Sequence, residues 1–287
     1  MPEWLPEPPI ELPSGRIIHV PGRGEMLLRD TGGDGAPVLL LHGWMFSADL
    51  NWWRTYGPLA EAGYRVLAVD HRGHGRGLRS PDPFTLKDCA DDAAALLAHE
   101  RIRPVLAVGY SMGGPIASLL ARDHPRSVAG IVLGATAMDW SAPRMKAFWR
   151  TMAALRLALG LAPESLWRRG LRSAGFPPSA ITTWTAAELS RGSSVDIAEA
   201  GRELGRYDST AWIAGLDAPA AVIVTTEDTG VPPRKQRALA AAMRAPMFEV
   251  RGDHGAVIVE ADEFNVQLLA ALDAVRDPRT AAATATP

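Results

Sequence analysis

The chain has 287 residues, long enough for one large α/β domain with an insertion or for two small domains. Apolar residues make up 47% of it, charged residues 22%, and the net charge is −2, so neither a nucleic-acid partner nor a charged membrane surface is expected. The single cysteine, Cys89, excludes an intrachain disulfide, and we expect it to be a buried, inert thiol. The sequence has no Cys and His pattern typical of a metal site, so no metal and no cofactor are expected.

The first residues of the chain predict an extended, proline-rich arm over residues 1–14. This segment has no basic region followed by an apolar one, so it does not resemble a signal peptide. No uninterrupted apolar run reaches the length needed to cross a bilayer. We therefore expect a soluble cytoplasmic protein with no integral membrane segment; its oligomeric state is left open.

Short apolar runs alternate with helical patterns along most of the chain. Strands are predicted at residues 16–20, 25–29, 38–41, 65–69, 105–109, 128–133, 220–225 and 247–250. Helices are predicted at residues 49–62, 85–101, 112–123, 232–243 and 256–275. Because strands that are apolar on both faces alternate with helices of ten or more residues, the pattern predicts an α/β fold with a mostly parallel sheet covered on both sides.

Residues 138–212 interrupt this alternation. They contain no strand-like run and hold most of the tryptophans, so we predict a helical cap inserted into a core formed by residues 1–137 and 213–287. The polar, alanine- and threonine-rich residues 277–287 predict a disordered tail. Apolar side chains of the insertion are candidates for the lining of a substrate pocket, although packing against the core is the favoured explanation for any single tryptophan. These candidates are Met138, Trp140, Phe148, Trp149 and Trp184.

The pentapeptide Gly109-Tyr110-Ser111-Met112-Gly113 lies between a predicted strand and a predicted helix. This is the G-x-S-x-G pattern, in which a sharp turn holds the serine in strained backbone geometry with its hydroxyl projecting from the sheet. Strand and helix crowd each other at such a turn, so the two outer positions require glycine. Ser111 is therefore the candidate nucleophile, with backbone N–H groups at the helix start placed to hold an oxyanion.

Other polar residues also follow predicted strands, where the chemistry of a parallel sheet collects. His42-Gly43-Trp44 follows residues 38–41, Asp228 follows residues 220–225, and His254 follows residues 247–250. The chain order is nucleophile, acid, histidine. Three other acids lie near these positions in the sequence. Asp139 follows another strand, Glu227 adjoins Asp228 and is expected to point elsewhere, and Asp253 adjoins the histidine too closely to reach its far ring nitrogen.

Taken together, the motifs resemble those of the α/β-hydrolase fold family over roughly residues 16–275. They are the His42-Gly43 dipeptide, Asp70-x-Arg72-Gly73-x-Gly75, the serine turn, the acid loop ending in Pro232, and Gly252-Asp253-His254. Many relatives have glycine where this chain has Thr225, a departure expected to affect the loop and not its carboxylate.

The resemblance implies a catalytic triad with Ser111 as nucleophile, His254 as base and Asp228 as the acid that orients the base. A neutral imidazole is needed because a serine hydroxyl is a poor nucleophile until its proton is removed. The resemblance also implies an oxyanion hole formed by the backbone N–H groups of Trp44 and Met112. His42 is expected to be structural.

A serine at the turn favours an acyl-enzyme mechanism, because dehalogenases and epoxide hydrolases of this family use aspartate there. The sequence therefore predicts a hydrolase of small to medium, mostly apolar carboxylic esters, with a small-molecule ester or lactone as its substrate. A lactonase, a C–C bond hydrolase and a slow-turnover ligand-binding or receptor-like protein remain alternatives. Haloperoxidase-type activity is less favoured, since those relatives generally lack a sizeable cap.

Overall fold

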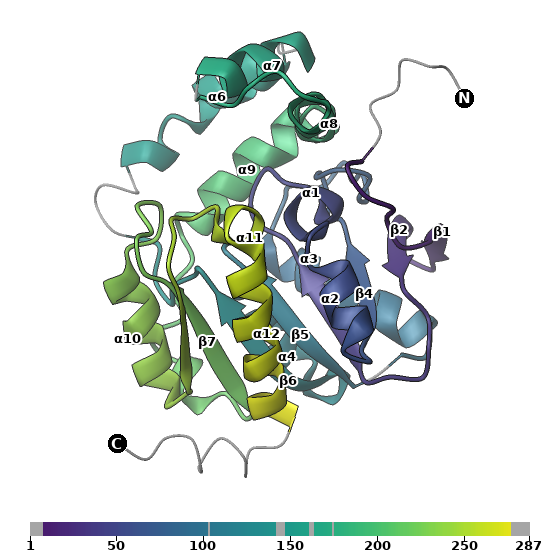
Figure 1. The fold of residues 1–287 in the computed structure, drawn as a ribbon, viewed down its shortest axis with the longest axis vertical. Coiled ribbons are helices and arrows are strands. Elements are labelled where there is room, and N and C mark those ends of the chain that lie inside the picture. Colours follow the sequence, from purple (N-terminus) through teal and green to yellow (C-terminus); the bar gives the residue numbers. More distant parts are fainter. Residues whose placement is uncertain (1–7, 103, 142–146, 161–163, 174, 277–287) are drawn as a thin grey trace.

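A computed structural model describes residues 8–102, 104–141, 147–160, 164–173 and 175–276. The centre of the molecule is an eight-stranded sheet in the order β1-β2-β4-β3-β5-β6-β7-β8 (Figure 1). Strands β1 (Gly15–Val20) and β2 (Gly24–Asp30) form an antiparallel hairpin, and β2 pairs antiparallel with β4 (Arg65–Val69). All other pairs are parallel, which confirms the predicted fold class. The remaining strands are β3 (Pro37–Leu41), β5 (Val105–Tyr110), β6 (Val128–Gly134), β7 (Ala220–Thr225) and β8 (Met247–Val250).

Helices cover both faces of the sheet, because its central strands are apolar on both sides. In β3, Val38 and Leu40 point into one core cluster, whereas Leu39 and Leu41 point into the other. Helices α1 (Ala48–Trp52), α2 (Tyr56–Glu61), α11 (Ala256–Val259) and α12 (Ala261–Arg276) contribute to the first cluster. Helices α3 (Leu86–His99), α4 (Gly113–Asp123) and α10 (Pro233–Met243) contribute to the second.

Two predicted helices are each divided in the structure. The helix predicted at residues 49–62 is α1 followed by α2, with a turn closed by the hydrogen bond from Thr55 N to Trp52 O at 2.8 Å. A continuous helix would place Pro58 in its interior, where proline has no N–H to donate and clashes with the preceding turn. In the observed arrangement Pro58 lies in the first turn of α2, where proline is tolerated. The helix predicted at residues 256–275 is α11 and α12, which are separated at Glu260.

The described parts of residues 138–212 contain helices that lie beyond one end of the sheet, toward the top of Figure 1. These helices are α6 (Met152–Gly160), α7 (Glu164–Ser173), α8 (Ala180–Leu189) and α9 (Ser194–Leu204). Their role as a cap separate from the core stays a prediction, and the predicted disordered tail lies outside the described residues. None of the helices in the described ranges combines the length and apolar character needed to cross a bilayer.

A buried carboxylate ties α8 to the loops of the core. Glu188 is 1% exposed and accepts hydrogen bonds from Arg76 at 2.7 and 3.0 Å, Ser47 at 2.8 Å and Arg191 at 2.8 Å. Burial alone would raise the pKa of Glu188, but the adjacent Arg76 keeps it below its usual value. An ionised carboxylate at this depth is tolerated only with such partners, so these bonds hold α8 in place.

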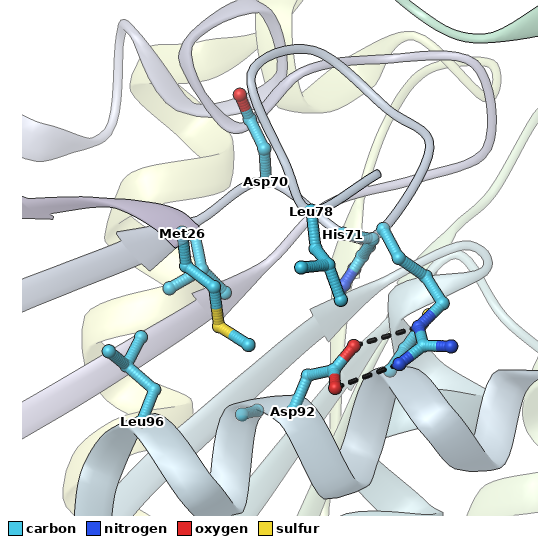
Figure 2. Close-up of a pocket in the computed structure, with 10 residues that line it drawn as sticks. Met26, Asp70, His71, Leu78, Asp92 and Leu96 are labelled. Atoms are coloured by element: carbon cyan, nitrogen blue, oxygen red, sulfur yellow. Dashed lines mark hydrogen bonds and ion pairs between the residues drawn. The ribbon is translucent and has the colours of Figure 1, made fainter. Parts of the chain in front are cut away.

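A small cavity of about 10 Å³ lies under the loop that follows β4, between Met26, His71, Leu78 and Leu96 (Figure 2). It has room for about one water molecule and none for a substrate. Arg72 closes one side with two hydrogen bonds to Asp92, at 2.8 and 2.9 Å. Cys89 also lines the cavity; it is 2% exposed, and burial raises the pKa of its thiol well above the usual value. The cysteine is therefore buried, as predicted.

Candidate active site

The turn after β5 places Ser111 in the left-handed region, with φ of 53°. Such a conformation costs a non-glycine residue about 1–2 kcal/mol, so surrounding contacts must impose it. Ser111 N donates to Gly134 O at 2.9 Å. A Cβ added to Gly109 would lie 2.2 Å from Gly113 O, and one added to Gly113 would lie 2.0 Å from Leu41 O. Both outer glycines are thus required by the packing of strand against helix.

The structure brings Ser111, His254 and Asp228 together from the loops that follow β5, β8 and β7. Ser111 Oγ lies 2.9 Å from His254 Nε2, and His254 Nδ1 lies 2.8 Å from Asp228 Oδ2. Asp228 is 4% exposed and Ser111 is 6% exposed, whereas 35% of the His254 side chain is accessible. An ionised carboxylate can only accept, so Nδ1 carries the proton and Nε2 is free to accept from the serine hydroxyl.

The Asp228 carboxylate is held by four donors besides the histidine. Its Oδ1 accepts from the backbone N–H groups of Gly230 at 2.8 Å and Val231 at 2.7 Å. Its Oδ2 accepts from Thr225 Oγ1 at 2.8 Å and Gln236 Nε2 at 3.1 Å. These contacts fix the plane of the carboxylate.

Sequence reasoning missed Gln236. The expectation that Thr225 would not affect the carboxylate is wrong, because its hydroxyl donates to Asp228. Gln236 is fully buried, and its side chain also accepts from Thr225 N at 3.0 Å and donates to Val231 O at 2.8 Å. One signal could have found it: Gln236 precedes Leu239 and Ala240 by three and four residues, so helical periodicity places a polar side chain on the buried face of α10.

Replacing Thr225 with valine tests this support, because valine keeps the shape and removes the donor to Asp228. We expect kcat for an ester substrate to fall about three- to tenfold, the equivalent of one hydrogen bond of about 1 kcal/mol, with little change in KM. The measurement is steady-state kinetics over a pH series. Thr226→Val is the matched control and should leave kcat unchanged. Wild-type kcat in a folded Thr225→Val protein would contradict the assigned role.

The other three acids do not contact the imidazole. The Asp139 carboxylate accepts from Ser141 N at 2.7 Å and lies 3.5 Å from Lys235 Nζ. Glu227 binds Arg251 at 2.9 Å, and Asp253 accepts from Thr229 N and from the backbone of its own neighbour, both at 2.7 Å. Within the described ranges, no group of three or more His, Cys, Asp or Glu side chains is arranged to hold a metal ion.

The two predicted oxyanion donors lie on the segments that flank the nucleophile. Met112 immediately precedes α4, and the loop of Trp44 abuts the serine, since a Cβ on Gly43 would lie 3.4 Å from Ser111 Cβ. Among the hydrogen bonds of the described residues, neither Trp44 N nor Met112 N has a protein acceptor. Both N–H groups are therefore available to a substrate oxygen.

His42 orients one of these donors through its tautomer. His71 N donates to His42 Nε2 at 2.9 Å, so the ring proton lies on Nδ1, which donates to Gly43 O at 2.8 Å. The Gly43 carbonyl and the Trp44 N–H belong to one trans peptide and point in opposite directions. Because the Gly43 carbonyl points toward His42, the Trp44 N–H points away from His42. Burial lowers the pKa of His42 well below its usual value, which keeps the acceptor nitrogen unprotonated.

A cavity of about 380 Å³, hereafter the side cavity, lies between the acid loop and the start of the insertion. Its lining residues are Ala137, Asp139, Trp140, Phe148, Thr229, Gly230, Val231, Pro232, Arg234 and Lys235. Two of the predicted pocket residues, Trp140 and Phe148, therefore line it.

The structure places the other three predicted pocket residues elsewhere. Trp149 packs on α9 and on Trp44, with 5.2 Å between the tryptophan ring centroids. Trp184 lies 6.2 Å from Trp53, in a separate apolar cluster. Met138 packs against the core. The side cavity gives no support to a substrate contact for these residues.

Comparison with known proteins establishes the family of the chain. A family model for the alpha/beta hydrolase fold matches residues 36–261. The chain is 30% identical over 276 residues to a Variovorax paradoxus protein named as a carbamate hydrolase, and the alignment covers 91% of this chain and 96% of that one. The chain belongs to the α/β hydrolase fold family.

Other relatives differ in their named activities. A non-heme haloperoxidase of Rhodococcus erythropolis is 40% identical over 110 residues, which is 38% of this chain and 39% of the relative. The chain thus matches only about two fifths of that relative's length. An esterase from Exiguobacterium antarcticum has a similar structure, with a TM-score of 0.77, 20% identity, and coverage of 91% of this chain and 100% of the esterase. At that identity the likeness shows the fold alone.

Proposed function

We propose that this α/β hydrolase is a serine hydrolase that cleaves small to medium, mostly apolar carboxylic esters through an acyl-enzyme on Ser111. The observation that carries the proposal is the continuous relay from hydroxyl to imidazole to carboxylate, with contacts of 2.9 and 2.8 Å. Each group has the hydrogen-bonding role that the chemistry requires, before any substrate is bound.

In the proposed reaction, Ser111 Oγ attacks the ester carbonyl while His254 Nε2 accepts the hydroxyl proton. The carbonyl oxygen becomes negative and accepts hydrogen bonds from Trp44 N and Met112 N, each worth about 3–4 kcal/mol in the transition state. His254 then returns the proton to the departing alcohol, which leaves an acyl-serine. Water, deprotonated by the same imidazole, attacks this ester and releases the acid and free Ser111. Asp228 stabilises the imidazolium during both formation and hydrolysis of the acyl-serine.

The insertion at residues 138–212 is proposed to act as the cap over this site, and the side cavity as the place for the acyl part of the substrate. The aromatic side chains of Trp140 and Phe148 support this assignment. Serine at the turn sets the chain apart from relatives that form an ester on aspartate.

A second activity is favoured by the similarity to a haloperoxidase. Hydrogen peroxide could replace water in the attack on the acyl-serine, and the product would be a peracid in place of the acid. No further protein group is needed for this reaction, so esterase and perhydrolase activities would share Ser111.

Covalent labelling and turnover test the proposal together. A fluorophosphonate probe should add its mass to the peptide that contains Ser111, and the labelled protein should lose hydrolysis of p-nitrophenyl butyrate in proportion. The panel should include longer acyl chains, lactones and vinylogous diketones, to separate esterase from lactonase and C–C hydrolase activity. Labelling without turnover on any substrate would favour a ligand-binding protein, and absence of labelling would overturn the proposed nucleophile.

A further inference from the structure

The side cavity combines apolar walls with an excess of positive charge. Trp140, Phe148 and Val231 supply apolar surface, and Arg234 and Lys235 supply two cations. Among the described residues of the lining, Asp139 is the only acid. The lining therefore carries one more positive than negative charge.

The acid is fully engaged and does not neutralise both cations. Asp139 lies 3.5 Å from Lys235 Nζ, and its backbone oxygen accepts from the same ammonium at 2.8 Å. Burial would raise the pKa of Asp139, but the hydrogen bonds from Ser141 and the charge of Lys235 lower it, so this carboxylate is ionised at neutral pH. Arg234 forms no ion pair with any acid in the part of the chain that the structure describes.

Helix stability does not account for these cations. Both lie in the first turn of α10, where the helix dipole favours acidic side chains. Arg237, one turn later, is different: it pairs with Glu249 at 2.8 Å on the outside of the molecule. An arginine that lines the same cavity as aromatic side chains suits a ligand with both an apolar body and a carboxylate. Arginine can bind such a carboxylate through two parallel hydrogen bonds.

The cavity also adjoins the reacting groups. Gly230 forms part of its wall, and a Cβ on Gly230 would lie 3.3 Å from His254 Cγ and 3.4 Å from Asp228 Oδ1. Gly230 therefore lies in the cavity wall and against the imidazole of His254. On the other side of the cavity, Ala137 forms part of the wall. Its neighbour Thr136 packs against the start of α4, because a Cβ added to Gly114 would lie 2.5 Å from the Thr136 side chain.

We propose that the side cavity binds the carboxylate end of the acyl chain of a half-ester, so that the preferred substrates are monoesters of dicarboxylic acids. The catalytic step rests on the proposed function. Ser111 attacks the ester carbonyl, the alcohol leaves with the proton from His254, and water releases the dicarboxylate. The second carboxylate takes no part in bond making; Arg234 holds it and thereby positions the acyl chain.

Two esters of nearly equal size test the proposal, mono-p-nitrophenyl glutarate and the p-nitrophenyl ester of glutaramic acid, whose terminal amide is neutral. For wild type we expect a higher kcat/KM with the half-ester. Arg234→Gln should lower kcat/KM for the half-ester about fivefold, which corresponds to the upper range of an exposed ion pair. The same variant should change kcat/KM for the amide less than about twofold. Arg234→Glu should lower kcat/KM for the half-ester further, because the new carboxylate repels that of the substrate. Arg237→Gln, the control on the same helix, should change neither substrate.

An unchanged ratio of the two substrates in both Arg234 variants would overturn the proposal. Equal losses for both substrates would also overturn it, because they would indicate a general structural effect. A monoester with the carboxylate on the alcohol part is a further arm; a preference for it over the glutarate ester would reject the assignment to the acyl chain.

Ligand binding separates failure of this inference from failure of the proposed function. In Ser111→Ala, 5-phenylpentanoate should quench tryptophan fluorescence, with weaker quenching in Trp140→Phe, and 5-phenylpentanamide should bind at least about fivefold more weakly. Adding Arg234→Gln should remove the preference for the carboxylate. If no ester is hydrolysed but this preference is present, the site stands and the esterase proposal falls. If esters are hydrolysed and acid and amide bind equally, the site falls and the esterase proposal stands.

Discussion

Replacing Ser111 with alanine is expected to lower kcat for p-nitrophenyl butyrate by about 10⁴- to 10⁶-fold, since removal of a serine nucleophile leaves only the oxyanion hole and substrate binding. Alanine retains the left-handed backbone at φ of 53° and leaves the contacts of Gly109 and Gly113 in place. The loss should therefore appear without a change in fold. The measurements are kcat by absorbance and the melting temperature by calorimetry.

Ser118→Ala is the matched control for this variant. Ser118 is also buried and lies within α4, the helix that follows the Ser111 turn, where its hydroxyl donates to Gly114 O at 2.9 Å. This substitution should change kcat less than twofold. Ser111→Gly adds a second check, because glycine adopts φ of 53° without strain and should raise the melting temperature while activity is lost. Substantial activity in either Ser111 variant would contradict the assignment of Ser111 as the nucleophile.

Replacing Asp228 with asparagine is expected to lower kcat by about 10⁴-fold through the wrong histidine tautomer. Two backbone N–H groups face Oδ1 at 2.7 and 2.8 Å, so the amide oxygen of asparagine would occupy that position. The NH₂ group would then lie where Oδ2 now accepts from His254 Nδ1. His254 would have to accept on Nδ1 and carry its proton on Nε2, where it could no longer accept the hydroxyl proton of Ser111.

Kinetics and labelling together check this explanation. Asp228→Asn should lose both kcat and the rate of fluorophosphonate labelling of Ser111, because the two reactions need the same free Nε2. Asp253→Asn is the control, since Asp253 accepts from backbone N–H groups and does not contact the ring. It should retain kcat within about threefold if its hydrogen bonds contribute less than about 1 kcal/mol to catalysis. Fast labelling in Asp228→Asn would contradict the tautomer argument.

Much of the fold and of the candidate site could be predicted because local patterns carry them. Runs such as residues 38–41 and 105–109 are apolar on both sides, which is typical of central parallel strands. Parallel strands bring their carboxyl ends to one edge, so the residues that follow each strand are neighbours in space. Ser111 and His254 were predicted in this way and lie 2.9 Å apart. Gly109 and Gly113 were predictable too, because a sharp turn between strand and helix leaves no room for Cβ.

Side-chain packing across the fold was harder to predict from the sequence. Trp140 and Trp149 belong to the same segment and have the same side chain, yet only Trp140 lines the side cavity. The helix predicted at residues 49–62 is broken before Tyr56, so that Pro58 falls in the first turn of α2; the apolar periodicity concealed this local signal. Gln236 was missed because its partners, Thr225 and Asp228, come from β7 and the loop after it.

The sequence by itself determined the order of strands and helices, the strained serine turn, and the three residue types that a serine hydrolase needs. These features depend on residues close together in the chain or on the common edge of a parallel sheet. Only the tertiary structure decided which donors hold Asp228, how His42 turns the Trp44 peptide, and where Arg234 and Lys235 meet the aromatic side chains of the insertion. Those contacts join segments far apart in the chain, and no local periodicity encodes the distances between them.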